Sequence, residues 1–269
     1  MLTNFNIENE IYERNTNKGG VNRLDKFFTH RGTCVEIFDD PIFGHVCLMD
    51  GKVQSAKMDE EIYHSYLASL GTCVDTTTKK IQSYPRRVLI IGSGEGCLAR
   101  EVLRWPETDE VVMVDWDADI IDAFRTRWNI WAGNSTWNNL RLKVEIADVW
   151  ELLDRVDNKT MWKFDCILVD LFDPDKRGVD GLLHWEKLMG GLNKWLTPGG
   201  RFAAYCGMQG EDVAEETVAY FSGGGEWRSG IPIKNSGCGG ILDDLVISKK
   251  YIPSFGGEAV FVSGRKAIQ

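Results

Sequence analysis

The chain has 269 residues, 43% of them hydrophobic and 26% charged, which is the composition of an ordinary globular protein long enough to bury a large core. The formal net charge of -9 argues against a nucleic-acid-binding surface and suits cationic partners. No apolar run reaches the roughly 18 residues of a membrane span, and the first residues show no export signal, so we expect no membrane association.

The polar beginning of the chain, residues 1–20, is predicted to be a flexible lead-in. Short alternating segments between residues 33 and 58, separated by Asp-Asp-Pro and Asp-Gly turn signals, predict the hairpins of a small antiparallel β unit. The next segment, "DEEIYHSYLASLGTC", has apolar residues at helical spacing, and Asp59 is placed to cap that helix. We assign residues 21–85 to an N-terminal β-hairpin domain.

From residue 86 onward, buried strand patterns alternate with helical ones. This alternation predicts a parallel sheet covered on both faces, an α/β Rossmann-like domain of the methyltransferase type over residues 86–269. Two strand-like runs near the end of the chain are predicted to close the sheet with antiparallel pairing.

A glycine loop, "IIGSGEG", follows the first strand of this domain and carries Gly92, Gly94 and Gly96. Glycine there permits a tight turn and a close approach of the backbone to a ligand. Asp115 ends the next strand, where a carboxylate can accept hydrogen bonds from both ribose hydroxyls, and Asp148 ends the third strand, where it can meet an adenine amino group. Either acid taken alone is equally explained as a helix N-cap.

These features predict a nucleoside site without a pyrophosphate cradle, because the loop lacks both the G-x-G-x-x-G spacing and a P-loop lysine. An S-adenosyl compound therefore fits better than NAD. Asp170 and Asp173 follow the fourth strand, in "FDCILVDLFDPD"; they are either a polar turn or acids facing the same crevice.

The carboxylate of Glu95, inside the glycine loop, distinguishes between two donors. It would repel the carboxylate of S-adenosylmethionine and attract the terminal ammonium of the decarboxylated form, unless it only caps the helix that follows. Together with Asp170 and Asp173 it favours cations on both sides of the transferred group, which indicates aminopropyl transfer to an amine.

Four segments, in chain order, resemble the aminopropyltransferases of the spermidine and spermine synthase family. They are "DGKVQSAKMDEEIYH" (50–64), "GSGEGCLAREVLRW" (92–105), "VDLFDP" (169–174) and "YIPSF" (251–255). The resemblance covers about residues 33–265. The Glu-containing loop, "GKVQSA" and "IPSF" are most similar to the thermospermine synthase branch, because spermidine synthases usually carry Asp in the loop.

The resemblance implies a role for each matching residue. Gln54, His64, Glu95, Asp115 and Asp148 would hold decarboxylated S-adenosylmethionine, Asp170 would be the catalytic carboxylate beside the attacking amine, and Tyr63 and Asp173 would bind the acceptor. Without the resemblance, Gln54 is better interpreted as a surface strand residue, and Tyr63 and His64 as half-buried helix residues satisfied by the backbone. The family further implies a homodimer or larger oligomer and no cofactor beyond the donor, which is a co-substrate.

Several positions depart from the family pattern. Gly32, Thr33 and Cys34 stand where relatives carry Tyr-Gln-Asp, Tyr205 stands where they carry Gln, and Phe255 where spermidine synthases carry Tyr. The loop after Pro174 is short and basic. The acceptor therefore stays open between spermidine and putrescine, and two other functions remain: a methyltransferase using S-adenosylmethionine, and a binding protein without turnover.

The cysteines and histidines predict neither disulfides nor a metal site. The seven cysteines are scattered without a C-x-x-C pair, which is typical of reduced thiols in a cytoplasmic protein. The four histidines show no ligand spacing, so no metal is predicted.

Overall fold

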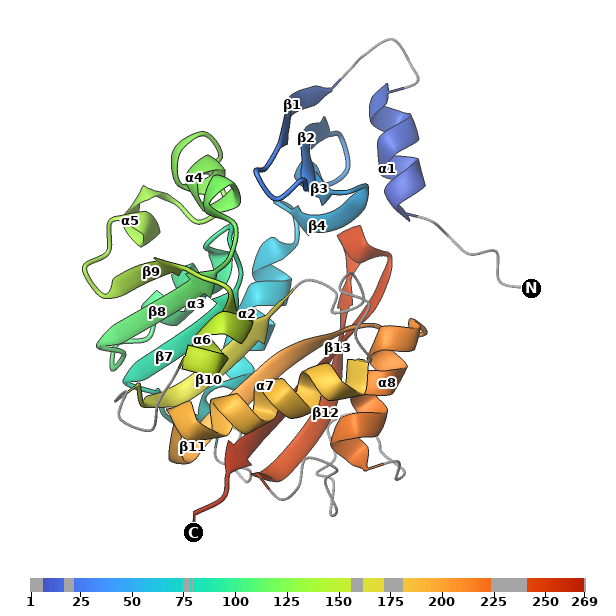
Figure 1. The fold of residues 1–269 in the computed structure, drawn as a ribbon. Helices are drawn as coiled ribbons and strands as arrows, with labels where there is room; N and C mark the ends of the chain where they lie inside the picture. Colours follow the sequence, from blue (N-terminus) through green and yellow to red (C-terminus); the bar gives the residue numbers. More distant parts are fainter. Residues whose placement is uncertain are drawn as a thin grey trace.

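The computed structural model describes residues 7–16, 22–74, 78, 80–155, 162–171, 181–223 and 241–268. Among them, a seven-stranded sheet and a four-stranded sheet organise the molecule, and the smaller sheet lies at one end of the larger one (Figure 1). A short pair, β5 (Cys73–Val74) and β6 (Ile81–Ser83), precedes the large sheet. None of the helices in the described ranges combines the length and the apolar character needed to cross a membrane.

The large sheet has the order β12-β13-β11-β10-β7-β8-β9. Its strands are β7 (Arg87–Gly92), β8 (Glu110–Asp115), β9 (Leu142–Ile146), β10 (Phe164–Asp170), β11 (Leu196–Met208), β12 (Leu242–Ile252) and β13 (Gly257–Lys266). The strands from β11 to β9 pair in parallel, whereas β13 pairs antiparallel with both β11 and β12. The predicted parallel sheet with antiparallel closure is therefore confirmed.

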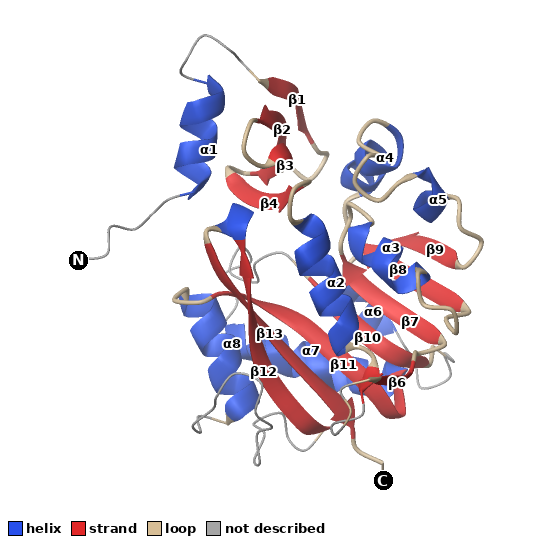
Figure 2. Ribbon diagram, turned by 180° about the vertical axis from the view of Figure 1, so that it is seen from behind, coloured by secondary structure: helices blue, strands red, loops and turns tan. Residues whose placement is uncertain are grey.

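Helices cover both faces of the large sheet, which explains why its central strands are apolar without alternation. One face carries α2 (Glu60–Leu70), α3 (Cys97–Leu103), α4 (Ala118–Thr126) and α5 (Asn134–Trp137), whose buried residues share one core cluster (Figure 2). The other face carries α6 (Val149–Arg155), α7 (Gly181–Trp195) and α8 (Asp212–Ser222), which form a second cluster (Figure 1). Helix α2, assigned from sequence to the N-terminal domain, thus packs on the large sheet.

The four-stranded antiparallel sheet has the order β1-β2-β3-β4, as the hairpin signals predicted. Its strands are β1 (Arg23–Phe28), β2 (Cys34–Asp40), β3 (Gly44–Met49) and β4 (Lys52–Ala56).

Part of the segment predicted to be a flexible lead-in, residues 1–20, is helical in the structure: helix α1 (Ile7–Thr16) packs on this sheet. Ile11 is fully buried in the small core, and Asp40 accepts hydrogen bonds from Arg14 Nε at 2.9 Å and Asn15 Nδ2 at 2.8 Å. One apolar face and a buried ion pair thus hold a helix whose overall composition is polar.

The predicted cap of α2 is also different. Asp59 occupies the N-cap position, but its side chain makes no capping hydrogen bond. Its carboxylate instead accepts Ser254 N at 2.6 Å and Ser254 Oγ at 2.8 Å, in the short helix η2 (Pro253–Phe255) between β12 and β13. The carboxylate therefore connects the start of α2 to the tip of the last hairpin.

Candidate active site

One cavity of about 660 Å³ lies at the carboxyl ends of β7, β8 and β10, where a parallel sheet places its ligand. It is lined by every predicted site residue that the structure describes: Gln54, Tyr63, His64, Gly92, Gly94, Glu95, Asp115, Asp148 and Asp170. Asp173 lies outside the described residues. The cavity therefore joins residues from the small sheet, α2 and the strand ends of the large sheet.

The glycine loop after β7 leaves no space for side chains at two positions. Gly92 has a φ of +85°, and a Cβ atom there would lie 2.1 Å from the carbonyl oxygen of Asp170. A Cβ on Gly94 would lie 3.0 Å from Asp115 Oδ2. The two glycines thus allow the loop to pass between the acids at the ends of β8 and β10.

The predicted nucleoside end of the cavity contains Asp115 and Asp148. Asp115 accepts Asp117 N at 2.9 Å, and burial raises the pKa of its carboxyl to about 6. It does not cap α4, since that role belongs to Asp117. Asp148 does resemble a cap, because its Oδ1 accepts Trp150 N at 2.9 Å at the start of α6 while the residue also lines the cavity.

The other end of the cavity is acidic and contains Tyr63, His64, Glu95 and Asp170. The Tyr63 hydroxyl donates to Asp170 Oδ1 at 2.6 Å. His64 Nε2 lies 3.0 Å from Glu95 Oε1 and 3.9 Å from Asp170 Oδ2, so the same ring nitrogen faces both carboxylates. Glu95 does not cap α3, whose N-cap residue is Gly96.

His64 is protonated in this setting. Burial lowers the pKa of the imidazole, but the close carboxylates of Glu60 and Glu95 and the negative charge of Asp170 outweigh that effect and raise the pKa to about 10. The acidic end therefore has one fixed cation among its carboxylates at neutral pH.

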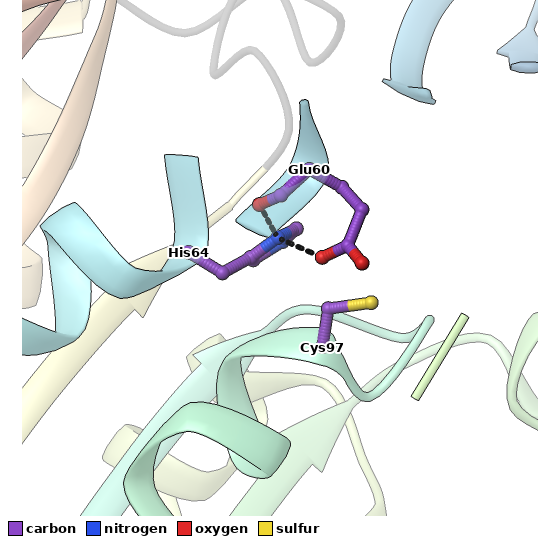
Figure 3. Close-up of side chains that lie close together, drawn as sticks. All are labelled: Glu60, His64 and Cys97. Atoms are coloured by element: carbon purple, nitrogen blue, oxygen red, sulfur yellow. Dashed lines mark hydrogen bonds and ion pairs between the residues drawn. The ribbon is translucent and has the colours of Figure 1, made fainter. Parts of the chain in front are cut away.

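Glu60, His64 and Cys97 bring ligand-type atoms within 4.8 Å of one another beneath this end (Figure 3). The Glu60 carboxylate already contacts Arg100 Nη2 at 2.7 Å and Lys57 Nζ at 2.6 Å. Burial raises the pKa of the Cys97 thiol well above its usual value, which opposes the thiolate that binds metals best. The contacts thus favour an ion-pair cluster over a metal site.

Aromatic rings surround Tyr63 at the acidic end of the cavity. The ring centroids of Tyr205 and Phe255, two departures from the family pattern, lie 5.5 Å and 5.8 Å from that of Tyr63, and both residues line the cavity. Gln54, from β4, donates only to backbone oxygens of its own strand, Lys52 O and Val53 O, at 3.3 Å.

Sequence reasoning missed two residues that line the cavity at the end that contains Asp115. Trp116 and Arg31 line the cavity, the Arg31 guanidinium lies 4.5 Å from the Trp116 ring centroid, and Arg31 Nε donates to Trp116 O at 2.8 Å. The position of Trp116 directly after Asp115 was a usable signal. The partner of Trp116 comes from the other sheet, which no local pattern indicates.

A model of the spermine/spermidine synthase domain matches residues 60–218 of the chain. The chain belongs to this family. The match confirms the family that the sequence motifs resembled, and it covers α2, the glycine loop and the strand ends that form the acidic part of the cavity.

Curated relatives within the family agree. A polyamine aminopropyltransferase from Aeropyrum pernix is 33% identical over 159 residues, 59% of this chain and 47% of that protein. The thermospermine synthase ACAULIS5 from Arabidopsis thaliana is 32% identical over 186 residues, 67% of this chain and 51% of that protein. The chain thus spans about half the length of these two relatives.

Solved structures in the family share the fold. A spermidine synthase in complex with the transition-state analogue AdoDATO superimposes with a TM-score of 0.72 at 20% identity, covering 93% of this chain and 75% of that one. The spermidine synthase from Thermotoga maritima gives a TM-score of 0.70, also at 20% identity, covering 93% of this chain and 74% of that one. The predicted α/β sheet with a small antiparallel β sheet is therefore confirmed.

Proposed function

We propose that this protein is a polyamine aminopropyltransferase, which moves the aminopropyl group of decarboxylated S-adenosylmethionine to a polyamine and releases methylthioadenosine. The observation that carries the proposal is the placement of Glu95 and Asp170 at the Nε2 side of His64, at one end of a cavity whose other end contains Asp115 and Asp148. Two carboxylates at the acidic end suit a donor ammonium and an acceptor amine.

The proposed reaction is an in-line displacement. The neutral nitrogen of the acceptor gives its electron pair to the aminopropyl carbon beside the sulfonium, the carbon–sulfur bond breaks, and its electron pair stays on sulfur in methylthioadenosine. Asp170 takes the proton that the acceptor amine carries at neutral pH, which frees the attacking electron pair, and later passes this proton to solvent; the extended amine leaves as an ammonium ion. A carboxylate in that role contributes about 10²- to 10⁴-fold to the rate. The Tyr63 hydroxyl, 2.6 Å from Oδ1, holds the carboxylate in place.

The donor would lie with its ribose hydroxyls on Asp115, its adenine near Asp148 and its terminal ammonium on Glu95. Because Gly92 and Gly94 have no side chains, the donor can approach the backbone of the loop. Gln54 and His64 complete the donor side, and Asp173 completes the acceptor side with Tyr63. No cofactor is needed, because the donor carries its own leaving group.

Spermidine is the acceptor that we propose, as in a thermospermine synthase. The Glu-containing glycine loop, the "GKVQSA" run and the "IPSF" motif support it, as does the similarity to the Arabidopsis relative of that name. Tyr63, Tyr205 and Phe255 offer ring faces to methylenes and ammonium groups of a longer amine. The alternative is a spermidine synthase that uses putrescine.

A methyltransferase that uses S-adenosylmethionine is the second candidate, because it would need the same nucleoside end. Glu95 weighs against it, since a buried carboxylate at this point repels the carboxylate of S-adenosylmethionine. For the assembly and its location we propose a homodimer or larger oligomer in the cytoplasm, on the family resemblance and the unpaired cysteines among the described residues.

Product analysis tests the proposed function. The protein is incubated with decarboxylated S-adenosylmethionine and, separately, putrescine, spermidine or spermine, and the amines are identified by mass spectrometry. Spermidine extended at its aminobutyl end supports the thermospermine-type activity, and spermidine made from putrescine supports the alternative. The absence of an aminopropylated amine in all three reactions refutes both.

A further inference from the structure

A buried carboxylate stands directly behind the acidic end of the cavity without lining it. The side chain of Glu60 is 2% exposed, and Glu60 is not among the residues that line the cavity. Its Oε1 accepts Lys57 Nζ at 2.6 Å and Arg100 Nη1 at 2.9 Å, and its Oε2 accepts Arg100 Nη2 at 2.7 Å. A two-point contact with a guanidinium holds a carboxylate in one orientation.

The far side of this carboxylate meets His64, four residues later on α2. His64 Nδ1 lies 2.6 Å from Glu60 O and 3.3 Å from Glu60 Oε2, while Nε2 lies 3.0 Å from Glu95 Oε1. A carbonyl oxygen can only accept a hydrogen bond, so Nδ1 must donate to Glu60 O. Nε2 faces the carboxylates of Glu95 and Asp170 at ion-pair distance rather than in a hydrogen bond, and two carboxylates there favour a second proton on the ring.

We propose that Glu60 is a positioning residue for the donor site: fixed by Arg100 and Lys57, it keeps His64 as an imidazolium whose charge pairs with Glu95 beside the terminal ammonium of the donor. The proposal rests on the proposed aminopropyl transfer for the identity of that ammonium. Glu60 acts through His64 and does not touch the substrate. Glu95 Oε1, 3.0 Å from Nε2, has no hydrogen-bond partner among the described residues, so the carboxylate keeps its capacity to accept a hydrogen bond from the donor.

The charges around His64 explain why Glu60 decides its state. The groups that face the ring come from α2, the segment before it, the glycine loop, α3 and β10: Glu60, Tyr63, Lys57, Glu95, Cys97, Arg100 and Asp170. Burial keeps the Cys97 thiol and the Tyr63 hydroxyl neutral by raising their pKa values well above the usual ones. If the charge of Glu60 is removed, the imidazolium is left near two cations, and its proton becomes easier to lose.

The first test is the titration of His64 in the ligand-free protein, followed by imidazole NMR and assigned by the signal missing in His64→Gln. We expect Glu60→Gln to lower the pKa of His64 by about 1 to 3 units, and Glu60→Asp, which keeps the charge, to restore most of it. Glu61→Gln is the matched control, because Glu61 is the next residue of α2 and its exposed carboxylate pairs with Arg104. An unchanged titration in Glu60→Gln overturns the proposal.

The second test is the pH profile of kcat/KM for the donor. For a shift of about 2 units, the ratio of wild type to Glu60→Gln should be near one at about pH 7 and rise to about tenfold at about pH 9, where only the variant has lost the imidazolium proton. A structural defect would lower activity by the same factor at every pH, and a constant ratio overturns the proposal.

Glu60→Gln removes the carboxylate that pairs with Lys57 and one of the two that pair with Arg100, which keeps Glu101 Oε1 at 2.8 Å, and the variant can fail to fold. The double variant Glu60→Gln/Lys57→Gln removes one charge of each sign. We expect the pKa of His64 to be lower in this variant than in the wild type, as in Glu60→Gln. An unchanged pKa overturns the proposal. The titration does not involve a substrate. If it shifts in a protein that transfers no aminopropyl group, the proposed function fails while the control of His64 by Glu60 stands.

Discussion

Glu95→Gln is the substitution that separates the two candidate donors. S-adenosylmethionine has a carboxylate that the decarboxylated donor lacks, and in the proposed pose it lies near Glu95. Two carboxylates about 4 Å apart repel by about 1 kcal/mol in water and about 4 kcal/mol at an effective dielectric constant of about 20. The Glu95 side chain is 10% exposed, which favours the larger repulsion energy. The His64 imidazolium, 3.0 Å away, cancels part of the negative charge of Glu95 and so reduces that repulsion.

A net penalty of about 1 to 2 kcal/mol predicts about five- to thirtyfold weaker binding of S-adenosylmethionine to the wild type. Glu95→Gln removes the repulsion from S-adenosylmethionine and weakens the contact with the ammonium of the decarboxylated donor. The ratio of the two dissociation constants should therefore fall to about threefold or less. Calorimetry with both ligands on both proteins measures this, with Glu186→Gln, an exposed carboxylate on α7, as the control. A preference that survives in Glu95→Gln would refute the role of Glu95.

Four other predictions follow from the site. Asp170→Asn should lower kcat by about 10²-fold or more while methylthioadenosine binding stays nearly intact; a variant with most of the wild-type rate would exclude Asp170 as the proton acceptor. Gly94→Ala should weaken methylthioadenosine binding about tenfold, because the new methyl group displaces the Asp115 carboxylate 3.0 Å away; unchanged affinity would mean that the carboxylate is not used. Since the pKa of Asp115 is raised to about 6 and the ribose hydroxyls need the ionised form, methylthioadenosine should bind best above that pH and lose affinity by up to about tenfold per unit below it, whereas Asp115→Asn should show no such dependence. Spermidine should give a higher kcat/KM than putrescine, and the reverse order would favour a spermidine synthase.

Local patterns were enough to predict the strand-end part of the site. Gly92, Gly94, Asp115 and Asp170 converge because the carboxyl ends of parallel strands meet at one edge of a sheet, so strand order and glycine spacing predict their proximity. Tyr63 and His64, which line the cavity, were predicted as site residues only through the family resemblance. No spacing rule indicates that α2 turns them toward β10.

What local patterns missed depends on contacts between distant segments. Helix α1 has a polar composition and one narrow apolar face, and it is held by Asp40, far along the chain. The Glu60–Arg100 pair joins two helices whose packing is a property of the whole fold. Asp59 stands at the sequence position of a helix cap. Its carboxylate instead accepts a hydrogen bond from Ser254, because the last hairpin folds back over α2. Asp173, outside the described residues, stays a prediction.

The most direct test of aminopropyl transfer compares the two nucleoside products in a single amine mixture. The wild-type protein is given putrescine, spermidine and spermine with either decarboxylated S-adenosylmethionine or S-adenosylmethionine, and the nucleosides and amines are quantified by liquid chromatography and mass spectrometry. We expect methylthioadenosine to form in equal amount with an aminopropylated amine from the decarboxylated donor, and no S-adenosylhomocysteine from the other. Formation of S-adenosylhomocysteine with a methylated amine, and no methylthioadenosine, would contradict the account.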